Sequence, residues 1–261
     1  QEIFHYLEKH TPSFVFGFNS LFFDEELLRS AFYQNLLNCY PTQTLGNQRG
    51  DALLMARAAS VFSPGTLKVS YNAKNKPDFK LENLSEANEL LHQEKHTALS
   101  DVHATTGLLK QIKDRDPKFF EACLLLTSKK GIQKFIQENQ VFCFAPSVDN
   151  PLVFTNIVQQ DGTYVLFDLT EDPNQYFDLT AKDLSSFIRK KGNPFYFVKN
   201  NRQPIFLDLS YKKFVNCGLS DEELFARAKK IQANKQFKNA VNLAATLTQR
   251  EWPMGSSVEE Q

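Results

Sequence analysis

Three short segments of the chain place a polar or ionisable side chain where a predicted strand ends or a predicted helix begins. The pairs, in chain order, are Asn19 with Asp24, Arg49 with Asp51, and His96 with Asp101. Carboxylates are the oxygen ligands that Mg²⁺ prefers, and an imidazole with a pKa of about 6.5 can accept a proton at neutral pH. These residue types suit metal-assisted hydrolysis. For any one pair taken alone, a helix cap or a surface histidine is the simpler explanation.

The spacing within "QEKHTALSDVHATTGLL", residues 93–109, depends on where a helix begins. Two side chains five positions apart on one unbroken helix point in different directions. If His96 lies in the loop before the helix and Asp101 lies in its first turn or two, both can face one cleft. The sequence therefore predicts a helix over 97–113 that begins between the two residues.

Hydrophobic periodicity predicts an α/β chain that changes near residue 140 from a helix-rich part to a strand-rich part with added helices. Before that point we expect a strand at 14–18, a long polar loop at 63–80, and helices at 24–38, 50–62, 83–91, 97–113, 120–128 and 131–139. After it we expect strands at 141–145, 151–159, 163–169, 194–199 and 204–208, and helices at 180–190, 220–233 and 236–247. We predict two domains, 1–139 and 140–250, and a disordered tail over 251–261.

The composition is that of a globular protein without a general basic field. Lys and Arg together number 30, as do Asp and Glu, and 42% of residues are hydrophobic. The four cysteines have no zinc-ligand spacing and are expected to be reduced thiols. No apolar run reaches the roughly 20 residues that span a bilayer, and no signal-peptide pattern is present, so we expect a cytoplasmic protein.

The three segments together resemble the later motifs of a known nuclease family. "GFNSLFFDEELLR", "RGDALLMARA", "KLENL" and "HTALSDVHAT" are similar to motifs of the DnaQ-like DEDDh 3′→5′ exonucleases, and most similar to the exodeoxyribonuclease I branch. "FDLTEDPNQYFDLTAKDL", "NPFYFVKNNRQPIFL" and "CGLSDEELFARAKKIQANKQF" resemble the SH3-like region of that branch. The resemblance covers nearly the whole chain. It implies an RNase H-like exonuclease domain followed by an SH3-like β-barrel region with added helices.

The resemblance also assigns roles to individual residues. It implies that Asp24 and Asp101 ligate metal, with a two-metal Mg²⁺ site in which Mn²⁺ is the alternative, and that His96 is the general base. Asp51 is interpreted as a helix cap. A surface salt bridge is the alternative for Arg49, and solvated charge is the alternative for each cation of the SH3-like region. The residues expected to contact DNA are Asn19, Arg49, Lys199, Arg202, Lys212 and Lys213. Asn19 is expected to order its turn through backbone hydrogen bonds.

One motif of the family is absent from this sequence. The family has an Asp-x-Glu on its opening strand, and no such pair precedes "FVFGFN", so two of the four metal carboxylates and the first strands of the sheet are missing. We expect the sequence to be a portion of a longer protein, incomplete at its N-terminus. A degenerate homologue that holds DNA without cutting it is the alternative.

The resemblance implies a monomeric enzyme that removes mononucleotides from the 3′ end of single-stranded DNA in repair and recombination. The acidic C-terminal tail of single-stranded DNA-binding protein is the second partner implied. Lys213 lies roughly where the family's tail pocket has a basic residue, next to a deletion in the local alignment. A non-catalytic DNA-binding or scaffolding module is the alternative function, and short RNA is a further substrate that the nuclease motifs do not distinguish.

Overall fold

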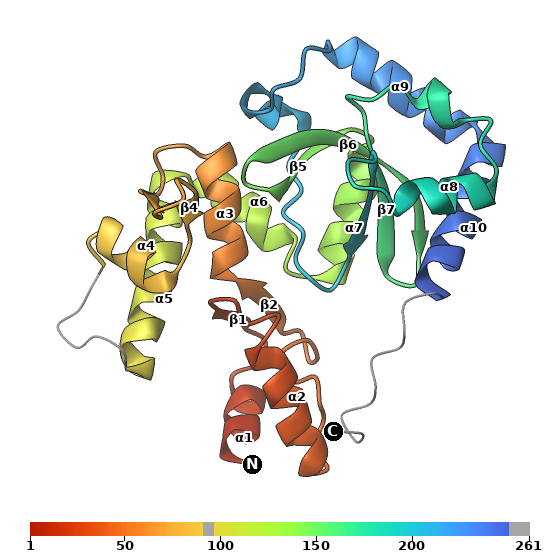
Figure 1. Cartoon of the computed structure of the whole chain (residues 1–261). Helices are drawn as coiled ribbons and strands as arrows, with labels where there is room; N and C mark the ends of the chain where they lie inside the picture. The colour runs from red at the N-terminus through yellow and green to blue at the C-terminus, as the bar shows by residue number, and fades with distance from the viewer. Residues whose placement is uncertain (91–96, 251–261) are drawn as a thin grey trace. The chain divides into compact units, whose positions relative to one another are not determined.

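The computed structural model describes residues 1–90 and 97–250 of the chain (Figure 1). The chain divides into two compact units. The first comprises Gln1–Phe135, Ala145–Pro151 and Asn201–Leu207, and the second comprises Ile136–Phe144, Leu152–Asn200 and the chain from Asp208 on. The first crossing lies close to the domain boundary predicted at 139/140. The sequence did not predict the two later returns into the first unit.

The first unit is mainly helical and contains two small sheets. Its elements are α1 (Glu2–Lys9), β1 (Phe14–Gly17), α2 (Asp24–Gln34), β2 (Gln48–Asp51), α3 (Ala52–Phe62), β3 (Ser70–Tyr71), β4 (Pro77–Asp78), α4 (Leu81–Ala87), α5 (Ala98–Arg115) and α6 (Pro117–Leu125), followed by α7 (Lys129–Glu138), which runs into the second unit. Helix α5 contacts α3, α4 and α6. The core of the unit includes Phe62, Leu84, Leu108 and Phe119, all essentially inaccessible to solvent.

Strands β1 and β2 form a two-stranded parallel sheet whose carboxyl ends lead to α2 and α3. Phe14 pairs with Gln48 and Gly17 with Asp51. Gly50 lies opposite Phe16, and a Cβ atom at residue 50 would collide with the Phe16 ring. Because parallel strands end at the same edge, the residues that follow β1 and β2 are brought together there.

The second unit contains most of a curled four-stranded sheet in the order β5–β6–β7–β8 (Figure 1). Its elements are β5 (Phe142–Ser147), β6 (Asn150–Gln160), β7 (Thr163–Asp168), a 3₁₀ turn (Pro173–Tyr176), α8 (Ala181–Ile188), β8 (Phe195–Lys199), a second 3₁₀ turn (Leu209–Phe214), α9 (Asp221–Ala233) and α10 (Lys235–Arg250). Strand β7 pairs antiparallel with β6 and β8. Edge-to-face aromatic contacts join Phe167, Tyr176 and Phe195 in the core.

The largest differences between the structure and the predicted elements are at residues 48–51, 63–80 and 204–208. Residues 48–51 form β2, where the helix was expected to begin at 50. The predicted loop 63–80 contains the β3–β4 hairpin, whose turn is closed by hydrogen bonds between Asn72 and Lys76. The strand predicted at 204–208 is wrong, because the backbone makes a tight turn there: the N–H of Phe206 donates to the carbonyl oxygen of Pro204, and only Leu207 has an isolated bridge.

Within the described ranges, no helix has both the length and the apolar character needed to cross a bilayer.

Candidate functional site

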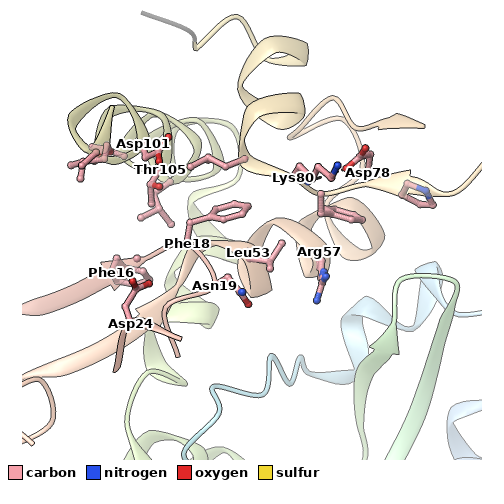
Figure 2. Close-up of a pocket in the computed structure, with 18 residues that line it drawn as sticks. Phe16, Phe18, Asn19, Asp24, Leu53, Arg57, Asp78, Lys80, Asp101 and Thr105 are labelled. Atoms are coloured by element: carbon pink, nitrogen blue, oxygen red, sulfur yellow. Dashed lines mark hydrogen bonds between the residues drawn. The ribbon is translucent and has the colours of Figure 1, made fainter. Parts of the chain in front are cut away.

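The first unit has an open pocket of about 880 Å³ at the edge where β1 and β2 end (Figure 2). Its lining comes from five places: the end of β1 and the turn after it, the start of α2, one face of α3, the segment from Pro77 to Leu81, and the first turns of α5. Four of these five places are ends of helices or strands. Residues that are far apart in sequence therefore line one space.

Asp24 and Asp101 both line this pocket. Asp24 is in the first turn of α2 and Asp101 is in the first turn of α5, and both residues are exposed. The amino end of a helix favours a negative charge, so both carboxylates are in a favourable field. The prediction that Asp101 lies in the first turn of a helix is confirmed. His96, the predicted general base, lies outside the described residues.

The start of α5 is fixed by a local cap. Thr97 is the N-cap residue, and its hydroxyl accepts a hydrogen bond of 3.1 Å from the backbone N–H of Ser100. We expect Thr97→Ala to lower the free energy of unfolding by about 1 kcal/mol, because one helix-end N–H loses its partner. Thermal unfolding of Thr97→Ala beside Thr97→Ser measures this effect, and equal stability of Thr97→Ala and the parent chain would contradict it.

Asp51 organises the turn on which Asn19 lies. Its Oδ1 atom accepts hydrogen bonds from the backbone N–H groups of Asn19 (2.8 Å) and Leu53 (3.0 Å), and Oδ2 accepts from that of Leu21 (3.3 Å). Asn19 needs this support, since its φ of 59° is left-handed. The prediction that Asp51 caps a helix is confirmed, because it is the N-cap residue of α3. Burial raises the pKa of the Asp51 carboxyl, and the N–H donors oppose that rise.

Arg49 does not provide the free cation that a phosphate contact requires, contrary to the prediction. It is 6% exposed, and its Nη1 lies 2.8 Å from Oε2 of Glu25, itself 5% exposed. Nη2 donates a 2.9 Å hydrogen bond to the carbonyl oxygen of Asn201. Burial lowers the pKa of Arg49, and the charge of Glu25 opposes this. The sequence could not indicate burial, because both partners are distant along the chain.

The structure also gives partners to three of the other predicted DNA contacts. Arg202 binds the carbonyl oxygen of Leu21 in the first unit. In the second unit, Lys212 pairs with Asp221 at 2.6 Å, and Nζ of Lys213 lies 5.0 Å from the centre of the Phe214 ring. Lys199 is exposed at the end of β8. None of these four lines the pocket, whereas Asn19 does.

Several pocket residues were not predicted from the sequence. They are Phe16, Phe18, Arg57, Asp78, Lys80 and Thr105. The alternation of Phe16 and Phe18 was a usable signal, because residues two apart on a strand share a face. The Arg57 guanidinium lies 5.9 Å from the centre of the Phe79 ring, a contact that no local pattern indicates.

The pocket offers carboxylate oxygens, which are the ligands that a hard divalent cation prefers. Mg²⁺ is commonly held by one or two carboxylates while it keeps several waters and binds substrate phosphate. Asp24 and Asp101 supply two exposed carboxylates to one space. No group of three or more metal-ligating side chains occurs within residues 1–90 and 97–250.

The chain is similar in sequence to curated exonucleases, although no family model matches it. Exodeoxyribonuclease I of Buchnera aphidicola subsp. Baizongia pistaciae is 31% identical over 210 residues, which are 78% of this chain and 40% of that protein. The Haemophilus influenzae protein of the same name is 35% identical over 123 residues, 47% of this chain and 26% of that protein. The Escherichia coli protein is 31% identical over 128 residues, 49% of this chain and 27% of that protein. The matches thus span less than half of each relative.

Solved structures show the same fold. Exonuclease I from Methylocaldum szegediense superposes with a TM-score of 0.78 at 22% identity, covering 93% of this chain and 57% of that one. Escherichia coli exonuclease I in complex with a dT13 oligonucleotide gives a TM-score of 0.77 at 20% identity, covering 98% and 61%. An ExoI/SSB-Ct complex gives 0.77 at 20% identity, covering 99% and 60%.

In sequence and in fold, the chain is an exonuclease-like protein with an open carboxylate pocket. Among exonucleases it is specifically exonuclease I-like.

Proposed function

We propose that this chain forms part of a 3′→5′ exonuclease that degrades single-stranded DNA to mononucleotides, with a role in DNA repair and recombination. The observation that carries the proposal is that Asp24 and Asp101, from two helices, line one open pocket in a chain similar to exodeoxyribonuclease I. In this proposal residues 1–139 are the C-terminal portion of an RNase H-like domain and 140–250 are an SH3-like region.

The proposed chemistry is hydrolysis of the terminal phosphodiester. Asp24 and Asp101 would hold Mg²⁺, with Mn²⁺ as a substitute, and the bound cation would polarise the phosphate and stabilise the leaving oxygen. His96 would take the proton of the attacking water, a role that rests on the sequence alone. Phe16 and Phe18 are half-buried on the pocket wall and would stack on terminal bases.

Single-stranded DNA is the proposed substrate and the tail of single-stranded DNA-binding protein the proposed partner. Solved exonuclease I structures of the same fold contain a dT13 oligonucleotide and SSB-Ct, respectively, which supports both. Lys199, Lys212 and Lys213 are proposed to meet phosphates or acidic groups. We place the protein in the cytoplasm as a monomer.

The test, on the whole exonuclease of which this chain is proposed to be part, is digestion of 5′-labelled single-stranded DNA, duplex DNA and single-stranded RNA of one sequence, each with Mg²⁺ and with a chelator. A ladder that shortens from the 3′ end only for single-stranded DNA, only with Mg²⁺, and far more slowly in His96→Ala is expected. Binding without cleavage would reject the exonuclease and support the scaffolding function. Equal digestion of RNA would reject DNA specificity.

A further inference from the structure

The turn after β1 and the first residues of α2, together called the turn 19–26, carry the pocket residues Asn19 and Asp24. Its hydrogen bonds within the turn run from Phe22 N to Asn19 O, from Glu25 N to Ser20 O and from Glu26 N to Phe23 O. Phe22 and Phe23 are more than half exposed and add little packing to the turn, whereas Leu21 is 2% exposed and packs into the core. Contacts from another segment of the chain also hold this turn.

Three consecutive residues, Asn201–Gln203, make those contacts. They belong to the returning stretch Asn201–Leu207 of the first unit. The central residue, Arg202, touches the turn at three points. Its Nη1 donates to the carbonyl oxygen of Leu21, its guanidinium lies 4.5 Å from the centre of the Phe22 ring, and its Nη2 is 4.0 Å from Oε1 of Glu26. A planar guanidinium can stack and donate at its edge at the same time, whereas an ammonium cannot.

The flanking residues reach the same turn through buried intermediates. The Asn201 carbonyl accepts from Arg49, which pairs with Glu25, the residue next to Asp24. The Gln203 side chain accepts a 2.6 Å hydrogen bond from the backbone N–H of Asp51. Asp51 in turn accepts from the N–H groups of Asn19 and Leu21. Residues 201–203 therefore all contact the turn 19–26, either directly or through Arg49 and Asp51.

Gln203 is buried and has an uncommon backbone conformation. It is 3% exposed and has a left-handed φ of 46°, which a non-glycine residue seldom adopts. This conformation lets the side chain bond to Asp51 while its neighbour Arg202 bonds to Leu21.

We propose that Asn201–Gln203 is a positioning segment that fixes the turn 19–26 and, through it, the pocket carboxylate of Asp24. Arg202 is its main positioning residue and is not a phosphate ligand. The fixing of the turn stands on its own, whereas its benefit for metal binding at Asp24 rests on the proposed function.

Amide hydrogen exchange of the full chain tests the fixing of the turn directly. We expect Arg202→Ala to speed exchange of the amides between Asn19 and Leu27 about tenfold, since hydrogen bonds to charged groups are lost there. Arg202→Lys keeps the positive charge but lacks the planar guanidinium. Its amide exchange rates in the turn should lie between those of the parent chain and those of Arg202→Ala. Lys199→Ala, at an exposed cation three residues earlier, is the matched control and should leave exchange unchanged.

Unchanged exchange of this turn in Arg202→Ala would overturn the proposal. If the amides of Arg202→Ala exchange quickly throughout the chain, exchange of the turn is compared between Arg202→Lys and Lys199→Ala instead. Equal exchange of the turn in these two variants would overturn the proposal. The Mn²⁺ affinity, measured by electron paramagnetic resonance, should fall in Arg202→Ala and not in Lys199→Ala.

The salt dependence of single-stranded DNA binding separates a positioning residue from a phosphate ligand. Loss of a phosphate contact lowers the salt slope by about one, whereas loss of a positioning residue leaves the slope unchanged. A lower slope with unchanged exchange overturns the proposal. Absence of both DNA binding and Mn²⁺ binding in the parent chain would reject the proposed function, and the exchange result would still decide whether the segment fixes the turn.

Discussion

Asp24→Asn and Asp101→Asn are each expected to lower Mg²⁺-dependent cleavage of single-stranded DNA by about 100- to 1,000-fold. A cation that stabilises a leaving oxygen contributes several kcal/mol, and each 1.36 kcal/mol is about a tenfold change in rate. Asparagine keeps the shape of the side chain and removes the charge that is proposed to hold the cation. Both residues are exposed at helix starts, so the loss should appear in activity much more than in folding.

The comparison needs a carboxylate on the same scaffold that does not line the pocket. Asp114→Asn meets this requirement, because Asp114 is an exposed residue of α5 outside the pocket lining. Single-turnover cleavage rates at several Mg²⁺ concentrations should be unchanged in Asp114→Asn. In Asp24→Asn and Asp101→Asn the remaining cleavage should reach half of its maximal rate only at a higher Mg²⁺ concentration. Full activity of both pocket variants would show that the site lies elsewhere.

The parts of the site that the sequence predicted are those fixed by local chemistry. Asp51 stands directly before an apolar helical segment, so its role as a cap could be inferred, and the structure confirms it. The same holds for Asp101, because Thr97 gives the helix a recognisable start four residues earlier. Caps depend on hydrogen bonds to N–H groups two or three residues away, which a sequence displays directly.

The parts that the sequence did not predict depend on contacts between distant residues. Arg49 was interpreted as a DNA contact, whereas its partner Glu25 is 24 residues away and Asn201 is 152 residues away. The strand expected at 204–208 had the right residue types, but the Phe206 N–H bonds to the Pro204 carbonyl in a tight turn, and the adjacent Gln203 side chain bonds to the distant Asp51. Propensity and periodicity describe neighbours along the chain and do not specify such contacts.

The buried pair of Glu25 and Arg49 gives the largest expected effect on stability. Glu25→Met leaves a buried guanidinium without its carboxylate, and breaking such a pair typically costs roughly 3–5 kcal/mol. Arg49→Met should cost less, because Glu25 keeps the Thr42 hydroxyl at 3.0 Å and Arg29 at 3.6 Å. Chemical denaturation followed by circular dichroism measures the free energy of unfolding of each variant.

The double variant Glu25→Met/Arg49→Met tests whether the cost arises from the unpaired charge. A well-packed apolar pair is often as stable as a buried ion pair, so the double variant should be more stable than Glu25→Met alone. We expect a coupling free energy of about 2 kcal/mol or more in the double-mutant cycle, as is found for residues in direct contact. If the two single effects simply add, the pair is not a coupled unit. In that case Glu25 would be held by Thr42 and Arg29 instead, and the link from Asn201 through Arg49 to the residue beside Asp24 would carry no energy.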